Sequence, residues 1–220
     1  MAYDAATSTA VLFGGYTGTA YLNDTWSWNG TAWTKLTPGT SPGIRAFASV
    51  AYDAPRSTVV LFGGQSSTNP TVLNETWTWN GTTWSKKTPT TSPAVRYLAP
   101  AAYDPATTGV VLFGGYSGST YLGDTWSWNG TNWTQSTGAP APSIRRADAL
   151  VFDSATNQLT LMGGYNGTSY LNDTWAWDGT VWSAPTACDI AAGARERGRR
   201  LSEPGRVGPG LWRDDDVGPV

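Results

Sequence analysis

The sequence contains no histidine and a single cysteine, Cys188, among its 220 residues. The chain therefore forms no internal disulfide, and chemistry that needs histidine as a metal ligand or catalytic base is excluded. The formal charge is −2 and no segment is strongly basic, so nucleic acid is not an expected partner. No apolar run approaches the ~20 residues of a membrane-spanning helix, and residues 1–20 lack a signal-peptide pattern. We expect no cofactor and no membrane partner.

Tryptophan, in contrast, is abundant and placed with a regular period. The chain has 13 tryptophans. A glycine pair follows an apolar run four times, at positions 14–15, 63–64, 114–115 and 163–164. Two tryptophans and then a third follow each pair, and equivalent positions are separated by 49 to 51 residues. A fixed period of this size indicates a solenoid, a propeller or an array of repeats.

Each repeat contains four candidate strands, which in the second repeat are residues 44–52, 58–62, 73–79 and 82–87. Trp77 and Trp79 are two residues apart, so both point to one face of the third strand. Asn80 and Gly81 predict a two-residue hairpin turn with positive φ at both positions. The fourth strand carries Lys86 and Lys87, which suit an exposed edge. The repeat is therefore expected to be a four-stranded antiparallel sheet.

Sheets of this kind arranged around an axis form a β-propeller, so the predicted fold is all-β with four blades. The blades are expected at residues 1–37, 44–88, 95–137 and 144–184. Residues 185–220 leave the pattern and predict an irregular, disordered tail. Residues 1–4 match only the end of a first strand. Four blades would then close imperfectly, form an open arc, or complete a ring with a second chain, and we favour an open or weakly closed unit.

This pattern resembles the kelch repeat family over residues 2–184. The matching features are the glycine pair after an apolar strand, the aromatic third strand, the tryptophan before a Thr/Ser/Lys-containing strand, and an arginine that opens the first strand (Arg45, Arg96 and Arg145). The resemblance implies a propeller of five to seven blades, so four repeats are a departure. It also implies contacts of these arginines with acidic partner peptides. The galactose oxidase-like copper chemistry of some relatives needs histidines and is excluded here.

One face of the predicted propeller gathers the loops after the glycine pairs and the linkers between blades. Guanidinium groups bind carboxylates in a bidentate manner, and aromatic rings stack on sugars or peptide groups. An alternative is that each arginine bonds to loop carbonyls or an aspartate of its own blade. The candidate ligand-binding residues on this face are Arg45, Arg96, Arg145, Tyr16, Gln65, Tyr116 and Tyr165.

Acidic residues also recur once in each repeat. Asp4, Asp53, Asp104 and Asp153 follow an aromatic residue and are expected to cap turns. A second set precedes the Thr-Trp pair and is interpreted as structural, although paired carboxylates are also the machinery of glycosidases. This second set comprises Asp24, Glu75, Asp124 and Asp173. Arg146 and Asp148 interrupt the repeat and suggest a local ion pair.

Three functions are compatible with this sequence. The favoured one is a binding module for a protein segment, possibly an acidic one, or for a carbohydrate. A second is a truncated repeat fragment with structural content only, because residues 21–31 and 170–180 are nearly identical, as after a recent duplication. The third is a carboxylate-based enzyme acting on glycans. Self-association that completes a ring is a further expectation.

Overall fold

The structure is a computed structural model that describes residues 1–67 and 71–184. Residues 1–184 form one compact unit, and the predicted tail at 185–220 lies outside the described residues. Nearly all regular structure in the described part is β-strand, and the exception is a short 3-10 turn, η1 (Ala54–Arg56). No helix in these residues is long and apolar enough to cross a membrane.

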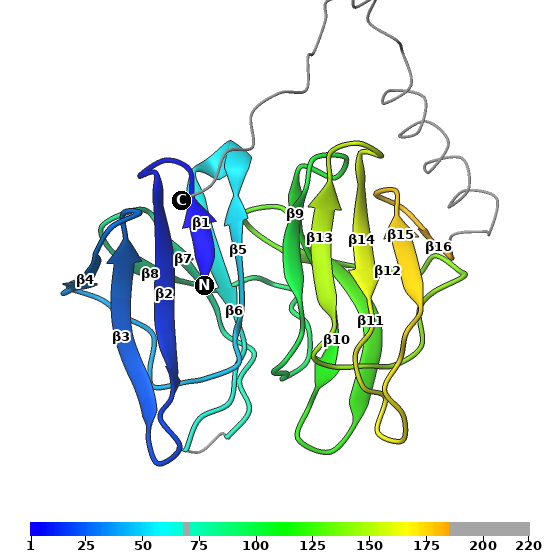
Figure 1. Cartoon of the computed structure of the whole chain (residues 1–220), viewed down its shortest axis with the longest axis horizontal. Helices are drawn as coiled ribbons and strands as arrows, with labels where there is room; N and C mark the ends of the chain where they lie inside the picture. The colour runs from blue at the N-terminus through cyan, green and yellow to red at the C-terminus, as the bar shows by residue number, and fades with distance from the viewer. Residues whose placement is uncertain (68–70, 185–220) are drawn as a thin grey trace, which may run out of the picture. The chain divides into compact units, whose positions relative to one another are not determined.

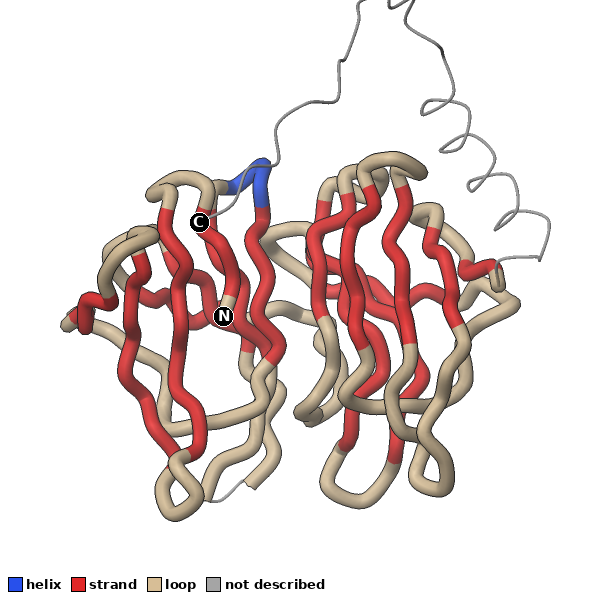
Figure 2. Tube along the Cα trace, in the orientation of Figure 1, coloured by secondary structure: helices blue, strands red, loops and turns tan. Residues whose placement is uncertain are grey.

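The strands form four separate antiparallel sheets, each drawn from one repeat (Figures 1 and 2). Blade 1 contains β1 (Ala2–Asp4), β2 (Thr9–Tyr16), β3 (Tyr21–Trp28) and β4 (Trp33–Leu36). Blade 2 contains β5 (Ser49–Asp53), β6 (Thr58–Phe62), β7 (Thr76–Trp79) and β8 (Trp84–Lys87). Blade 3 contains β9 (Ala101–Asp104), β10 (Gly109–Tyr116), β11 (Tyr121–Trp128) and β12 (Trp133–Ser136). Blade 4 contains β13 (Ala149–Asp153), β14 (Gln158–Met162), β15 (Thr174–Trp177) and β16 (Trp182–Ser183).

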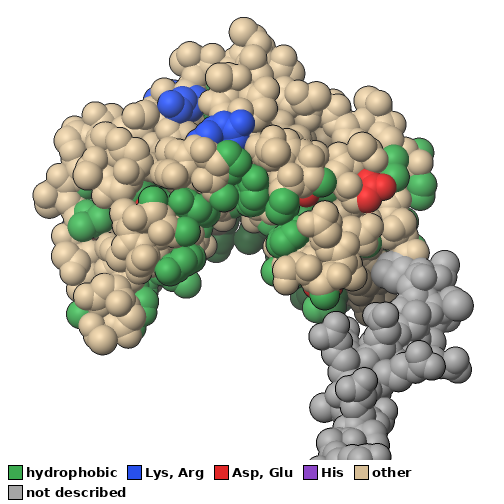
Figure 3. Space-filling view, turned by 90° about the horizontal axis from the view of Figure 1, so that it is seen from above, with side chains coloured by type: hydrophobic (Ala, Val, Ile, Leu, Met, Phe, Trp, Pro, Cys, Tyr) green, Lys and Arg blue, Asp and Glu red, His purple; other side chains and the backbone are tan. Residues whose placement is uncertain are grey.

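The blades are arranged in sequence order as an open arc. The innermost strands β1, β5, β9 and β13 contact one another in that order. Hydrophobic side chains gather on the concave side of the unit (Figure 3). There, the inner strands of blades 2 to 4 line a trough of about 360 Å³, with Ala51, Ala102 and Val151 among its walls. The predicted all-β architecture of four kelch-type blades is confirmed.

The first strand of blade 1 is present but short. Residues Ala2–Asp4 form β1, which pairs with β2 from Ala2↔Val11 to Asp4↔Thr9. The corresponding strands of blades 2 and 4 have five residues each. The blade is therefore four-stranded even though only the last part of the first-strand pattern is present.

The turn between the third and fourth strands differs from the predicted two-residue hairpin. Trp79 pairs with Trp84, so the loop has four residues, and only Gly81 among them has positive φ. The Oδ1 atom of Asn80 accepts hydrogen bonds from the N–H groups of Thr82 and Thr83 at 3.0 and 2.9 Å. Asparagine therefore acts through its side chain, as in an Asx turn, and not through a left-handed backbone.

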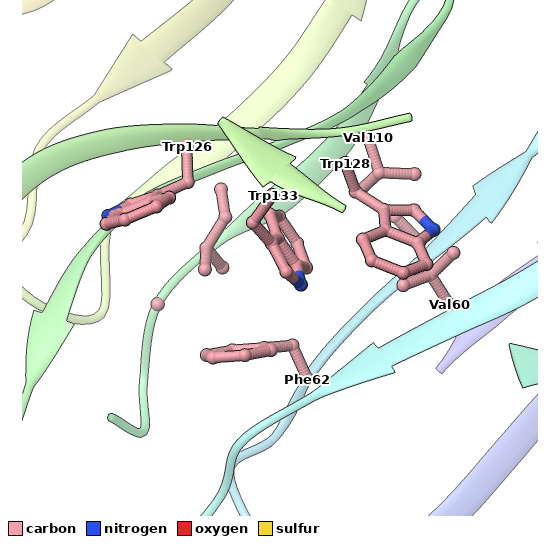
Figure 4. Close-up of a cluster of buried hydrophobic side chains, with 9 residues drawn as sticks. Val60, Phe62, Val110, Trp126, Trp128 and Trp133 are labelled. Carbon is pink, nitrogen blue, oxygen red and sulfur yellow. The ribbon is translucent and has the colours of Figure 1, made fainter. Parts of the chain in front are cut away.

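Tryptophans fill the space between neighbouring blades. At the junction of blades 2 and 3, Phe62 meets Trp133 edge to face with ring centroids 5.1 Å apart. Figure 4 shows Val60 and Phe62 of blade 2 facing Val110, Trp126, Trp128 and Trp133 of blade 3. The equivalent rings at the other junctions are Phe13 with Trp84, at 5.2 Å, and Phe113 with Trp182, at 5.4 Å. Each junction thus repeats one packing arrangement, with one face contributed by each blade.

Candidate functional site

The three repeated arginines are buried and paired within their own blades. The side chain of Arg45 is 2% exposed. Its guanidinium donates to the carbonyl oxygen of Gly63 at 3.1 Å and to Oε2 of Glu75 at 2.6 Å, and its Nε donates to the Gly43 carbonyl. Each of the three guanidinium nitrogens therefore has a partner. The contacts match the alternative interpretation, in which the arginine ties down its own blade.

Arg96 and Arg145 repeat this arrangement with bidentate ion pairs. The two terminal nitrogens of Arg96 donate to Asp124 at 2.7 and 2.8 Å, and those of Arg145 donate to Asp173 at 2.6 and 2.8 Å. Arg96 also donates to the carbonyl oxygen of Gly114, and Arg145 to that of Gly163; each glycine is the first of the glycine pair in the same blade. All three guanidinium groups are buried and bonded to groups of their own blades. The predicted direct contact of these arginines with a ligand is not tested by these contacts and stays a prediction.

The carboxylates that precede the Thr-Trp pairs are held by several donors. Burial disfavours the charged form of Glu75, but hydrogen bonds from Arg45, Lys86 and Trp77 outweigh it and lower its pKa to about 2. Burial also opposes ionisation of Asp124, and the bonds from Arg96 again win, so its pKa lies below the usual value. In every blade the first tryptophan donates its indole N–H to this carboxylate, two residues earlier. These side chains are therefore engaged in structural bonds.

The backbone of each arginine joins its blade to the preceding one. The N–H of Gly64 donates to the Arg96 carbonyl at 2.9 Å, and the N–H of Arg96 donates to the Leu73 carbonyl at 3.0 Å. A Cβ on Gly63 would overlap the same Arg96 carbonyl, and Gly63 has φ +66°. The glycine pair is thus required both by its backbone angles and by the close approach of the next blade.

The turn-capping aspartates divide into two groups. Asp4, Asp104 and Asp153 each accept the N–H two residues ahead through Oδ1 at 2.9 to 3.0 Å, which confirms the predicted caps. Asp53 instead forms an ion pair with Arg56 at 2.9 Å. Burial raises the pKa of Asp53, and the Arg56 charge only partly offsets this effect.

Pairs of tyrosines, tilted against each other, flank the loops that follow three of the glycine pairs. Tyr16 contacts Tyr21, Tyr116 contacts Tyr121, and Tyr165 contacts Tyr170, with centroids 4.7 to 5.0 Å apart. Tyr97 adds a contact within blade 3, to Tyr116 at 5.6 Å, and Tyr121 contacts Tyr165 across blades 3 and 4 at 5.8 Å. We call Tyr97, Tyr116, Tyr121, Tyr165 and Tyr170, with Arg146, the loop-face cluster.

Arg146 lies over this aromatic surface and does not pair with Asp148, so the predicted ion pair is wrong. Its guanidinium carbon is 5.1 Å from the ring centre of Tyr116 and 5.4 Å from that of Tyr121. Within the described residues Arg146 forms no ion pair. The rings hold the cation through cation–π attraction and leave its hydrogen-bonding capacity available.

Asp148 faces the centre of the arc without a partner. Both its carboxylate oxygens are buried and have no hydrogen-bond partner among the described residues. It lines a pocket of about 220 Å³ with Phe47, Leu98 and Pro100 among its neighbours. Burial in these surroundings raises the pKa of Asp148 to about 7.

The structure brings together some of the predicted site residues and separates others. Tyr116 and Tyr165 lie in the loop-face cluster, whereas Tyr16 forms its own pair with Tyr21. Gln65 forms backbone bridges with Ala46 and Val72. The prediction did not include Tyr97 or Tyr121. A useful signal was the position after each repeated arginine, which varies as Ala46, Tyr97 and Arg146 in an otherwise regular repeat.

Comparison with known proteins agrees with this architecture. A family model described as the KLHDC2/KLHL20/DRC7 kelch-repeats domain matches residues 1–187. No curated protein matches the sequence. Kelch-repeat domains are generally protein-interaction modules. With a family match that spans all four blades, the chain belongs to the kelch-repeat family.

Proposed function

We propose that this protein binds an acidic segment of a partner protein through the loop-face cluster. The observation that carries the proposal is the position of Arg146 over Tyr116 and Tyr121, unpaired among the described residues. A carboxylate of the partner would accept hydrogen bonds from this guanidinium in a bidentate manner. The surrounding rings would pack against the partner's backbone and apolar side chains, as aromatic anchors do in many interfaces.

In this proposal the buried arginines support the face from below. Arg96 and Arg145 hold the bases of the loops that carry Tyr116 and Tyr165, since both donate to the glycine pairs where those loops begin. Their role is to position the tyrosines, and the half-buried Arg146 supplies the charge that forms no ion pair with a described residue. For Arg45, Arg96 and Arg145, we therefore propose that they position the loops of this face, in place of the direct ligand contact expected from the sequence.

Carbohydrate is a second candidate ligand for the same face. Tyr170 is 88% exposed and Tyr16 is 48% exposed, so both rings offer open surfaces. Aromatic faces of this kind stack on the apolar faces of sugar rings. A neutral glycan would not need the Arg146 charge, so the effect of Arg146 substitutions distinguishes the two ligands.

A peptide array with graded Asp and Glu content tests the proposal. We expect acidic peptides to bind, and we expect Arg146→Ala to weaken the best of them at least about tenfold, which corresponds to ~1.4 kcal/mol. Arg146→Lys should retain part of the affinity, because the charge remains while the planar fork is lost. Lys35→Ala is the matched control, since it removes one positive charge from the outer strand β4.

Two outcomes would contradict the proposal. One is binding that does not depend on peptide charge, and the other is equal affinity for the parent protein and the Arg146→Ala variant. If the Arg146→Ala variant still binds a neutral glycan and the Tyr170→Ala variant does not, the carbohydrate alternative would be favoured.

A further inference from the structure

The two ends of the arc expose complementary halves of the blade junction. At each internal junction, one blade contributes an indole face made by its second, third and fourth strands. The preceding blade contributes an opposing face made by its first and second strands and by a threonine of its third strand. Among the residues that the structure describes, no blade packs against the indole face of blade 1 or against the opposing face of blade 4. This matching motivates the inference below.

The indole face of blade 1 is already assembled. Trp28 and Trp33 are tilted against each other, with centroids 5.4 Å apart and planes at 41°, and the equivalent pair in blade 2, Trp79 and Trp84, has nearly the same values of 5.4 Å and 46°. Exposure is the difference: Trp33 is 44% exposed and Trp84 only 1%. With Leu12 and Trp26, Trp33 lines an apolar hollow. The face therefore has the geometry of a junction, but no described residue supplies an opposing blade.

The opposing face of blade 4 shows the same difference. Met162 occupies the position of Phe13, Phe62 and Phe113, each of which packs against a tryptophan of the next blade. Met162 is 57% exposed, whereas Phe62 is 1% exposed. Val151 occupies the position of Ala51, which is buried in the junction of blades 2 and 3, and is 59% exposed. Two large apolar side chains therefore remain open on this face.

A polar contact in the internal junctions is also missing at both ends. Trp84 donates its indole N–H to the Thr25 hydroxyl at 3.0 Å. The other two junctions repeat the bond at 2.9 and 2.8 Å. By position, the next members of this series are Trp33 as donor and Thr174 as acceptor. In the described part of the chain neither makes this bond.

We propose that the blade 4 face of one copy docks on the blade 1 face of a second copy. Trp33 would pack against Met162 of the second copy and donate to the hydroxyl of its Thr174. The contact is heterologous, so it generates either a closed ring or an open chain of copies. Within these 220 residues blade 1 has no counterpart of Arg45, so the interface would rely on the indoles without the arginine clamp. Assembly should therefore be reversible and dependent on concentration.

Sedimentation velocity of the full chain across a range of concentrations tests this proposal. We expect the parent protein to associate, and we expect Trp33→Arg or Met162→Arg alone to weaken association at least about 100-fold. Thr34→Arg is the matched control, because Thr34 is adjacent on β4 and points to the opposite face. This control should associate like the parent protein.

Mixing the two variants identifies the head-to-tail geometry. The Trp33→Arg protein keeps an intact blade 4 face and the Met162→Arg protein keeps an intact blade 1 face. Their mixture should form a 1:1 dimer that neither variant forms alone. A parent protein that stays monomeric overturns the proposal. So does association that only one of the two substitutions abolishes, which would indicate a contact between identical faces. Circular dichroism of each variant confirms that a loss of association is not a loss of folding.

Discussion

The indole nitrogen of Trp133 donates a 2.9 Å hydrogen bond to the hydroxyl of Thr76, which lies 57 residues earlier and in the preceding blade. Thr76 is 1% exposed, as is Trp133, so neither group can exchange its partner for water. Repeated at three junctions, this bond fixes how far each tryptophan inserts toward the preceding blade. The stability of the unit therefore depends on residue pairs that belong to different repeats.

Thr76→Val tests this dependence, because it keeps the shape of the side chain and removes the acceptor. The buried indole N–H of Trp133 would lose its partner, so we expect a loss of about 1–3 kcal/mol in the free energy of unfolding. Urea denaturation measures it. Thr174→Val provides the matched control at the equivalent position of blade 4, where no tryptophan of the described residues donates to the hydroxyl; at concentrations at which the protein is monomeric, it should change stability by less than about 0.5 kcal/mol. Equal effects of the two substitutions would contradict this role.

The substitutions Gly63→Ala and Gly163→Ala distinguish two costs of an alanine in the glycine pair: the strain of a positive φ and the overlap of the new Cβ with the next blade. Both positions have positive φ, +66° and +72°, so alanine costs about 1–2 kcal/mol at either. At Gly63 the new methyl would also overlap the Arg96 carbonyl, whereas at Gly163 the nearest atom is the Leu171 carbonyl oxygen at 3.5 Å. We expect Gly63→Ala to be the more destabilising by at least about 1–3 kcal/mol. Thermal unfolding monitored by circular dichroism provides the comparison.

Arg96→Met should destabilise the protein strongly, by roughly 3–5 kcal/mol, because it leaves the Asp124 carboxylate and the Gly114 carbonyl without their donor. A double-mutant cycle with Asp124→Asn isolates the ion pair. The double variant should be more stable than the sum of the two single effects predicts, because its remaining partner is uncharged. Strict additivity would show that the pair contributes little.

Asp148→Asn should stabilise the protein in a way that depends on pH. The pKa of Asp148 is raised by burial to about 7 from its ordinary 3.8, so the native state binds more protons than the unfolded state between these values. The stability of the parent protein therefore falls as the pH rises from about 4 to 7. Asparagine does not ionise in this range, so the Asp148→Asn variant does not lose stability in this way. We expect a gain of about 1–2 kcal/mol at pH 8, allowing for partial solvation, and almost none at pH 4. Urea unfolding at a series of pH values measures the difference, and a gain that is the same at every pH would contradict it.

The sequence predicts the blades well, because their determinants are local and repeated. The positions of Trp77, Trp79 and Trp84 define one strand pair and its buried face. The glycine pairs mark the ends of the second strands, although β2 and β10 continue through them to Tyr16 and Tyr116. The four-residue turn was not predicted because Asn-Gly fits two turn types equally well until the register of the tryptophans is known.

The candidate site is less predictable because it depends on contacts between repeats. The sequence places Arg146 two residues before Asp148, which suggests an ion pair. In an extended chain, side chains two residues apart share a face, but Ala147 between them has a positive φ of 56°, which breaks this alternation and directs the two side chains to different surroundings. The rings of Tyr116 and Tyr121, contributed by the preceding blade, attract the guanidinium instead. No pattern within one repeat contains that information.

The two unlike faces of each blade give the fold a direction. Every blade offers the same pair of surfaces, one for its predecessor and one for its successor, so duplicating a whole segment of 49 to 51 residues adds a matching junction and disturbs none of those already formed. Evolution by copying is therefore compatible with this architecture at every step, and chains of different length can share one set of contacts.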